Sequence, residues 1–366
     1  MKITLPEYIQ NLPPYTPIEP FDVLSERIGR APEEIVKLDA NENPYGMSPR
    51  AQVALAELTF GHIYPDPESR ALRAALEDFT KTPVENLLVG AGADELIDLI
   101  MRVVLSPNDT IINCPPTFGM YAFDANLNNA QVVNVPRDSD FSVDVDGIIN
   151  AVEKHSPKLV FLTSPNNPDG SLLVKADLER LFELPCMIVL DEAYIEFAAP
   201  ESLGRELSQI SQVAERENLI VLRTFSKLAG LAGLRVGYGA FPGWLMPILW
   251  KAKQPYNVNV AASVAALAAL DDVDYLQKVV VQLVDERKRL FDALKSISWL
   301  EPYPSNANFV LCRVVGRDAA KLKAALASEY GIFIRYFNKP GLDDHVRISV
   351  GKPEQIDFLL EVLRKM

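Results

Sequence analysis

Six short apolar runs recur between residues 86 and 241, and each is followed by a polar turn. They read LLVG, TIINC, KLVFLT, MIVLD, LIVLRT and LRVGYGAF, with segments of helical spacing between several of them. Parallel strands require a crossover of a dozen or more residues, usually a helix, and strands covered on both faces are apolar almost throughout. The pattern therefore predicts an α/β domain with a large, mainly parallel sheet flanked by helices.

Helices are expected between these strands and after them. The segment 94–105 has apolar residues at helical spacing and two acids in its first turn, and 177–182 and 206–215 are further candidates. The longest apolar run, 260–270, has 11 residues interrupted by Ser263 and falls short of the ~20 residues that cross a bilayer. We therefore expect a core helix there and no membrane partner.

The pattern of predicted helices and strands changes after residue 270. A long periodic helix over 271–298 leads to FVLCRV, a helix over 319–330, IFIRYF, VRISVG and a final helix ending at residue 365. These elements predict a smaller α+β C-terminal domain at 271–366 beside a large domain at 30–270. Residues 1–29 contain five prolines, and we expect an N-terminal arm that does not begin as regular structure.

Charge and cysteine usage exclude several classes of function. Lys and Arg number 36 against 49 Asp and Glu, and the net charge of −13 disfavours binding to nucleic acid or anionic membranes. Cys114, Cys186 and Cys312 lie in apolar segments and indicate reduced core residues of a cytoplasmic protein. No export signal is visible, and the three histidines lack metal-ligand spacing, so we expect no metal.

Polar residues follow each predicted strand, and the carboxyl ends of parallel strands open on one crevice. GAGADE follows the first strand at 90–95, where glycines before a helix let backbone N–H groups approach an anion. It is neither a dinucleotide fingerprint nor a Walker loop, because Glu95 replaces the third glycine and no GK[ST] follows. Alone, the segment is equally consistent with a tight turn at a helix start.

Three further strand ends carry candidate chemistry. SPNNPDG follows KLVFLT, and Asp191 ends the MIVLD strand, where a buried carboxylate requires a cationic partner. Thr224 to Lys227 follow LIVLR, and Arg235 comes eight residues later. Each of these alone is compatible with a structural salt bridge or a solvated loop. Four such segments at one edge are not explained in that way.

These segments, in this order, resemble the fold-type I aminotransferases, which use pyridoxal 5′-phosphate (PLP). The resemblance rests on SPNNPDG, LDEAY, TFSK and LAGLRVGYG. KLDANENPYG, YPDP, GAGADEL, PPTFGMY, RTFSK and RYFNKPGLDDHVRISVG are similar, more narrowly, to the histidinol-phosphate aminotransferase family. Together the motifs cover nearly the whole chain.

The resemblance implies roles around the cofactor. Lys227 matches the lysine that carries PLP and then serves as the general base, which requires a lowered pKa. Asp191 matches the carboxylate that keeps the pyridine nitrogen protonated, and Asn167 and Tyr194 match the two donors to the phenolic oxygen. The catalytic residues implied are thus Lys227, Asp191 and Tyr194. Those matching the phosphate site are Ala93 and Asp94 through backbone N–H, and Thr224, Ser226 and Arg235 through side chains.

Two aromatic residues also match cofactor contacts of the family. Phe118 stands where an aromatic ring stacks on the cofactor, and many relatives have tyrosine there. Tyr64 matches a tyrosine that reaches the phosphate of the neighbouring subunit, which implies a homodimer. Ile63 stands before it, where relatives often have arginine.

Substrate recognition requires sites for two anions. Arg347 matches the arginine that binds the carboxylate, and Arg335 the one that binds the substrate phosphate. Without the motifs around them, both would be taken for surface charge. Tyr15 and Asn43 are expected to complete the pocket.

The implied reaction is PLP-dependent transamination of L-histidinol phosphate with 2-oxoglutarate. Its products are imidazole-acetol phosphate and L-glutamate, and it belongs to L-histidine biosynthesis. Two alternatives use similar motifs, an aromatic amino acid aminotransferase and an L-threonine-O-3-phosphate decarboxylase. A third alternative is a binding or regulatory protein without turnover, but no matched position is lost here.

Overall fold

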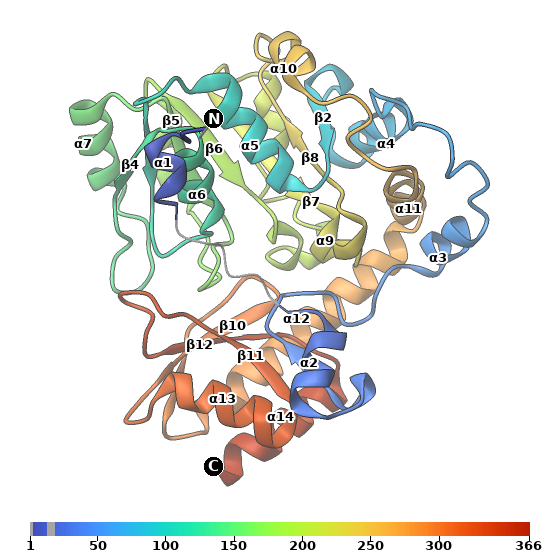
Figure 1. The fold of residues 1–366 in the computed structure, drawn as a ribbon, viewed down its shortest axis with the longest axis vertical. Coiled ribbons are helices and arrows are strands. Elements are labelled where there is room, and N and C mark those ends of the chain that lie inside the picture. Colours follow the sequence, from blue (N-terminus) through green and yellow to red (C-terminus); the bar gives the residue numbers. More distant parts are fainter. Residues whose placement is uncertain (1–2, 13–18) are drawn as a thin grey trace.

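The structure, a computed structural model, describes residues 3–12 and 19–366 and contains two sheets surrounded by helices (Figure 1). The larger sheet has seven strands, and every strand pair is parallel except the two that β8 makes. In spatial order the strands are β2 (Leu87–Gly90), β8 (Gly237–Ala240), β7 (Leu219–Thr224), β6 (Met187–Asp191), β5 (Leu159–Thr163), β3 (Thr110–Asn113) and β4 (Gln131–Asn134). The predicted large, mainly parallel sheet is confirmed.

Both faces of this sheet are buried. Val221 of β7 belongs to the core on one face and Leu222 to the core on the other, because side chains alternate along a strand. The helices around the sheet are α3 (Pro49–Ala56), α4 (Arg70–Thr80), α5 (Ala93–Val104), α6 (Met120–Leu127), α7 (Val145–His155), α8 (Lys175–Phe182), α9 (Phe225–Leu228), α10 (Met246–Ala252) and α11 (Val260–Leu270). Burial on both faces explains why the strands are almost wholly apolar.

The helices expected at 94–105, 177–182 and 260–270 are confirmed as α5, α8 and α11. Five residues of α11 are buried, so the apolar run is a core helix. In the described ranges, no helix combines the length and the apolar character that a membrane crossing demands. The three cysteines are buried and unpaired, as predicted.

The helix expected at 206–215 is wrong. The segment contains only the short 3-10 helix η5 (Ile210–Ala214). Before it, the backbone N–H of Gln209 and the hydroxyl of Ser208 donate to the buried carboxylate of Glu192, at 2.7 and 2.5 Å. Such side-chain partners compete with helical hydrogen bonds. The other 3-10 helices are η1 (Pro32–Glu34), η2 (Val84–Asn86), η3 (Ile195–Phe197), η4 (Pro200–Ser202) and η6 (Ala232–Leu234).

The smaller sheet has five strands and lies opposite the strand ends of the large sheet (Figure 1). In spatial order they are β1 (Val36–Leu38), β11 (Ile332–Tyr336), β12 (His345–Ser349), β10 (Phe309–Val314) and β9 (Leu300–Pro302). Its helices are α12 (Val273–Lys295), α13 (Ala319–Tyr330) and α14 (Pro353–Lys365). Strand β1 falls within the range 30–270, yet it pairs in parallel with β11. The chain thus forms a strand of the smaller sheet before it continues to the helices around the large sheet.

Residues 3–6 have no regular structure, but two helices follow in the N-terminal region. Helix α1 (Glu7–Gln10) follows Pro6, and α2 (Phe21–Ile28) follows Pro20. Both prolines stand just before the first helical residue, where a missing N–H breaks no intrahelical bond. Helix α1 lies against α6 of the large sheet, whereas Leu24 of α2 packs with Phe333 of the smaller one (Figure 1).

Candidate active site

The carboxyl ends of β5, β6 and β7 lie side by side and carry polar residues, as parallel strand ends should. They are Thr163, Asp191 and Thr224, and the register places Thr163 directly beside Asp191. The smaller sheet faces this edge (Figure 1), and Arg347 of β12 donates a hydrogen bond from Nη1 to Oδ1 of Asn167, just after β5. The predicted residues of both domains therefore meet at the boundary between the sheets.

Lys227 lies in the single turn of α9, directly after β7. Its Nζ donates to the backbone carbonyl of Ala40 at 3.0 Å. Burial, together with the nearby Arg347, lowers the pKa of the Lys227 amine to about 8. An amine with such a pKa is partly neutral near pH 7 and can act as a nucleophile and base.

Asp191 is 5% exposed and receives two hydrogen bonds. Tyr121 Oη donates to Oδ2 at 2.6 Å, and the backbone N–H of Ala193 donates to Oδ1 at 3.0 Å. Burial raises the pKa of the Asp191 carboxyl to about 6. No lysine or arginine in the described part of the chain forms an ion pair with it. A buried carboxylate without a protein cation fits a cationic ligand such as a protonated ring nitrogen.

Asn167 and Arg347 orient one another. Because Arg347 Nη1 donates to Asn167 Oδ1, the amide nitrogen of Asn167 is the end left to donate elsewhere. Arg347 Nη2 donates to the carbonyl of Asp39 at 2.8 Å, while its buried Nε has no partner in the described residues. Burial lowers the pKa of Arg347 to about 10. An unpartnered buried N–H of an arginine fits a carboxylate or phosphate oxygen.

The predicted phosphate residues surround the start of α5. Gly92 has φ +83° directly before Ala93, the first residue of this helix, whose backbone N–H groups are free to bind an anion. Arg235 donates from Nη2 to Asp94 Oδ2 at 2.8 Å. A Cβ on Gly92 would lie 2.7 Å from the same nitrogen, so the guanidinium packs over this turn.

The hydroxyls of Thr224 and Ser226 complete this group. Thr224 Oγ1 accepts from the Ser226 backbone N–H at 3.0 Å and donates to Ser226 Oγ at 2.9 Å, which caps α9. Because Ser226 Oγ receives that bond, its own hydrogen remains available to an anion.

Arg335 lies opposite Arg347 on neighbouring strands of the smaller sheet. Its guanidinium lies 5.8 Å from the ring centroid of Phe337, and the Arg347 guanidinium lies 5.6 Å from the same ring. The charge of Arg335 contributes to the lowered pKa of Arg347. No carboxylate in the described ranges pairs with Arg335. Two neighbouring cations without a shared carboxylate favour a dianion between them.

Phe118 is half-buried next to the Asp191 site. Its ring meets the ring of Tyr121 edge to face, with centroids 5.6 Å apart. Tyr121, fully buried, in turn stacks on Phe161 of β5. Phe118 is thereby held at the strand-end edge, where an aromatic ring bound by Asp191 would need a stacking partner.

Tyr64 and Asn43 make contacts within this chain that the sequence does not indicate. The loop after α3 lies at the edge of the molecule (Figure 1), and Tyr64 in this loop is 78% exposed and stacks on Tyr256. Asn43 donates to the carbonyls of Lys227 and Leu228 at 3.4 and 3.2 Å, so its amide supports α9. Tyr15 lies outside the described residues.

Sequence reasoning missed Tyr121 and Asn41. Tyr121 ends the segment PPTFGMY, but nothing in the sequence says that its hydroxyl reaches Asp191. Asn41 stands in DANENPYG, and its Nδ2 donates to Tyr194 Oη at 3.0 Å. Tyr121 and Asn41 are bonded to the candidate site residues Asp191 and Tyr194 from elements distant in the chain, and only the fold brings them together.

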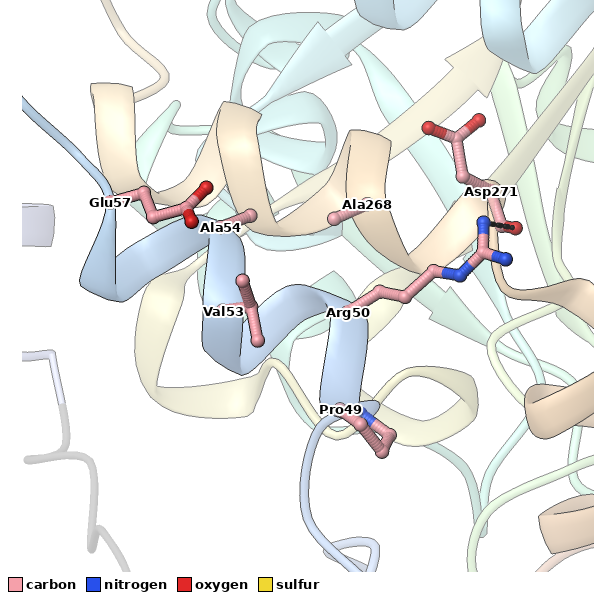
Figure 2. Close-up of a pocket in the computed structure, with 7 residues that line it drawn as sticks. All are labelled: Pro49, Arg50, Val53, Ala54, Glu57, Ala268 and Asp271. Carbon is pink, nitrogen blue, oxygen red and sulfur yellow. Dashed lines mark hydrogen bonds between the residues drawn. The ribbon is translucent and has the colours of Figure 1, made fainter.

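A separate hollow lies between α3 and α11 (Figure 2). It is lined by Pro49, Arg50, Val53, Ala54, Glu57, Ala268 and Asp271, and Arg50 Nη1 donates to the Asp271 carbonyl at 2.8 Å. None of the strand-end residues lines this hollow. Its position on the outer side of two helices makes it no part of the candidate site.

Comparisons with known proteins show the family of the chain. The family Aminotransferase class I and II matches residues 33–363. A chloroplastic histidinol-phosphate aminotransferase of Nicotiana tabacum is 56% identical over 358 residues, which are 98% of this chain and 85% of that protein. A histidinol-phosphate aminotransferase of Roseiflexus castenholzii is 53% identical over 365 residues, covering 98% and 96% of the two chains.

A solved structure is similar over the same extent. Histidinol-phosphate aminotransferase from Sinorhizobium meliloti, in complex with pyridoxal-5′-phosphate, superposes with a TM-score of 0.89 at 30% sequence identity. The match covers 99% of this chain and 96% of that one. The arrangement of the large sheet and the smaller C-terminal sheet is therefore the arrangement of this structural relative.

Proposed function

This chain belongs to the aminotransferase class I and II family, and from that premise we propose that it transfers the amino group of L-histidinol phosphate to 2-oxoglutarate with PLP as cofactor. The products are imidazole-acetol phosphate and L-glutamate, a step of L-histidine biosynthesis. The observation that carries the proposal is the pair Arg335 and Arg347, which face the strand-end site without a shared carboxylate. A substrate phosphate is a dianion and matches two adjacent guanidinium groups.

The residues at the strand ends fit PLP. When bound, the cofactor supplies an electron sink that stabilises negative charge at the reacting carbon. The buried Asp191 would hold the proton on its ring nitrogen, and Phe118 would lie along the ring. The start of α5 with Ser226 and Arg235 would bind its phosphate.

The remaining work is proton handling by side chains. Lys227 can hold or release a proton at Nζ near neutral pH, because burial lowers its pKa to about 8. It can therefore take a proton from the substrate carbon and return it one position away. Asn167 Nδ2 and Tyr194 Oη are the donors available to the phenolic oxygen of the cofactor.

The direct test is amino transfer from histidinol phosphate to 2-oxoglutarate by purified protein. We expect glutamate to form, and faster than with phenylalanine or tyrosine as donor. Carbon dioxide release from threonine phosphate, or preferred turnover of aromatic amino acids, would instead support one of the two alternative activities. Absence of every one of these reactions would refute an enzymatic role.

We also propose that the active unit is a homodimer. Five apolar residues are exposed in α3, in the loop that follows it and in the segment stacked on that loop: Val53, Phe60, Ile63, Tyr64 and Tyr256. A concentration of large exposed apolar side chains is typical of an interface. Tyr64 is 78% exposed and would reach the cofactor phosphate of a second copy.

Mixing two inactive variants tests the dimer. Lys227→Ala lacks the lysine, and Tyr64→Ala is expected to lack the contact across the interface. A mixed dimer contains one site with both residues intact, so activity should return on mixing, to about one quarter of the wild-type value for random pairing. Failure to recover activity, or full activity of a monomer in sedimentation experiments, would contradict the shared site.

The cytoplasm is the proposed location. Cys114, Cys186 and Cys312 are all free and buried, which is typical of proteins in reducing compartments. Fractionation of cells, followed by assay of the soluble and membrane fractions, tests this assignment.

A further inference from the structure

Asn41 connects the two domains at the point where Tyr194 enters the site. It lies in the loop after β1 and is 1% exposed. Its backbone N–H donates to Ser349 Oγ at 2.9 Å, and Ser349 Oγ donates to Asn41 Oδ1 at 2.9 Å. Asn308 Nδ2 donates to the Asn41 carbonyl at 2.9 Å, and Asn41 Nδ2 donates to Tyr194 Oη at 3.0 Å. Every polar group of Asn41 is therefore bonded, on both sides of the domain boundary.

These contacts fix which way the amide points. Ser349 Oγ accepts the Asn41 backbone N–H and donates its own hydrogen to the amide oxygen of Asn41. The amide oxygen must then face Ser349, and the amide nitrogen must face Tyr194. The direction rests on the two hydrogen bonds of the amide, to Ser349 and to Tyr194. Asn41 holds this position with φ +56°, a backbone conformation that asparagine and aspartate tolerate.

The amide direction in turn fixes the hydroxyl of Tyr194. Its oxygen receives a hydrogen from Asn41, so its own hydrogen must be donated elsewhere. The hydroxyl has no other hydrogen-bond partner in the described parts of the chain. Its ring is held edge to face against Phe309 of β10, with centroids 5.2 Å apart. A buried O–H with a fixed direction and no acceptor in the chain is prepared for a ligand acceptor.

We propose that Asn41 is a positioning residue that makes Tyr194 a hydrogen-bond donor to the bound cofactor, and that Ser349 keeps Asn41 in this role. The inference rests on the proposed function, because the acceptor is the phenolic oxygen of PLP. Ser349 lies on β12, so the donor direction depends on the smaller sheet being seated against the large one. Arg347, which is also on β12, likewise orients Asn167, because its hydrogen bond to Oδ1 leaves the amide nitrogen of Asn167 as the donor.

Several charges act on the Tyr194 phenol besides Asn41. Burial raises its pKa, and the negative charges of Asp191 and Asp94 raise it further. Arg347 and the hydrogen bond from Asn41 lower it. A test must therefore separate the hydrogen bond from a change of charge at position 41.

The principal experiment is Asn41→Asp, alone and combined with Tyr194→Phe. A carboxylate accepts from both Ser349 and Tyr194, so the phenol hydrogen turns away from the cofactor oxygen. That oxygen is then less stabilised as an anion, and the midpoint of the pH-dependent absorbance of the bound cofactor should rise by about one pH unit. In the Tyr194→Phe background, Asn41→Asp should move the midpoint by much less. An equal rise in both backgrounds would overturn the proposal, since it would be a plain charge effect.

Ser349→Ala is the second variant and introduces no charge. It removes the donor that holds the amide oxygen, so the Asn41 amide can reverse. We expect a rise of the same sign and about half the size, again only when Tyr194 is present. No rise in this variant would show that Ser349 does not set the direction.

A titration of the cofactor-free protein distinguishes failure of this inference from failure of the proposed function. The ionisation of Tyr194 is obtained as the difference between the ultraviolet titrations of proteins with Tyr194 and with Tyr194→Phe. Asn41→Asp should raise the pKa of Tyr194, because a donor to the phenolate is replaced by an acceptor and a negative charge. An unchanged or lowered pKa would contradict the assigned hydrogen bond. If PLP produces no absorbance band and hydride fixes nothing on Lys227, the proposed function fails, while this titration still tests Asn41.

Discussion

The ends of β6 and β7 carry charged residues on both faces of the large sheet. These charges are neutralised by an ion pair on one face but not on the other. On one face, Arg223 Nη2 and Glu196 Oε1 form an ion pair at 2.7 Å, with side chains 0% and 1% exposed. On the other face, Asp191 is as deeply buried but is bonded by a phenol and a backbone N–H instead of a cation. Asp191 and Glu192 are neighbours in sequence, yet Glu192 belongs to the Arg223 face.

This contrast separates charges that the chain pairs itself from charges that a ligand must pair. Burial of an ion is unfavourable by several kcal/mol unless an opposite charge and hydrogen bonds compensate it. Around Arg223 the opposite charge comes from Glu196 and is present once the chain folds, although Nε and Nη1 of Arg223 have no hydrogen-bond partner among the described residues. Around Asp191, Arg335 and Arg347, the charge compensation that the described residues provide is incomplete. The position of unpaired buried charge therefore marks the site more sharply than the hollow between α3 and α11, which lies elsewhere (Figure 2).

The largest expected effect concerns Lys227, which lies at the strand-end site, where the charge compensation is incomplete. Lys227→Ala should lower kcat by at least about 10⁴-fold, because one group supplies both the covalent link and the proton transfer. Unfolding by urea should change little, since Lys227 contributes one hydrogen bond to the fold. Steady-state rates and hydride reduction followed by peptide mapping measure the two effects. Lys251→Ala, an exposed lysine of α10, is the matched control and should retain activity. A cofactor label on another side chain would show that Lys227 is misassigned.

Arg223 tests the paired face and should affect stability most. Arg223→Met leaves the Glu196 carboxylate buried without its cation, so the free energy of unfolding should fall by about 3–5 kcal/mol. Urea unfolding of the cofactor-free protein measures this loss. Adding Glu196→Gln to Arg223→Met should recover part of it, because the unpaired charge is then removed. If the double variant is as unstable as the sum of the two single ones, the ion pair does not couple β7 to η3.

Asp191 provides the pH-dependent counterpart. Its pKa is about 6 in the folded protein against 3.8 for the free side chain, since burial disfavours the ionised form. The folded state then binds more protons than the unfolded state, so stability falls as the pH rises from about 4 to about 6. Ionisation of Asp191 should account for a loss of about 3 kcal/mol in cofactor-free protein, and this contribution should be complete slightly above pH 6.

Asp191→Asn should remove this pH dependence, and bound PLP should remove it too by supplying a cation. Urea unfolding at pH 4, 5, 6 and 7, with and without cofactor, measures both. The same loss in the Asp191→Asn variant would assign it to another buried acid. Glu192 is the neighbour to consider, because burial raises its pKa to about 7.

The parallel strands and the residues directly after them could be predicted from the sequence because both signals are local. Burial on both faces produces apolar runs such as LIVLRT, and the motif TFSK stands directly at the strand end. Lys227 and Asp191 were found in this way. Strand β1 could not be found, because three residues show no periodicity and its partner β11 lies almost 300 residues away.

Pairing between distant side chains was equally out of reach. LDEAYIEF contains three acids, and the sequence does not tell which one faces Arg223 and which one remains without a cation. The answer depends on the alternation of faces at the ends of β6 and β7. The same limit applies to Asn41. Its hydrogen-bond partners Tyr194, Ser349 and Asn308 all lie far from it in the sequence.

Arg335 gives the smallest effect and sharpens the comparison at the substrate. Arg335→Ala should raise the KM for histidinol phosphate about ten- to a hundredfold, because one charge-assisted contact to a dianion is lost, about 1.5–3 kcal/mol. The KM for glutamate should rise less, since Arg347 remains for its carboxylate. Arg313→Ala is the control, because Arg313 on β10 is already paired with Asp344 at 2.8 Å. Equal losses for both substrates would mean that Arg335 contributes only to the general electrostatics of the cleft. A loss confined to the phosphorylated substrate would identify Arg335 as a charge that is paired by the ligand.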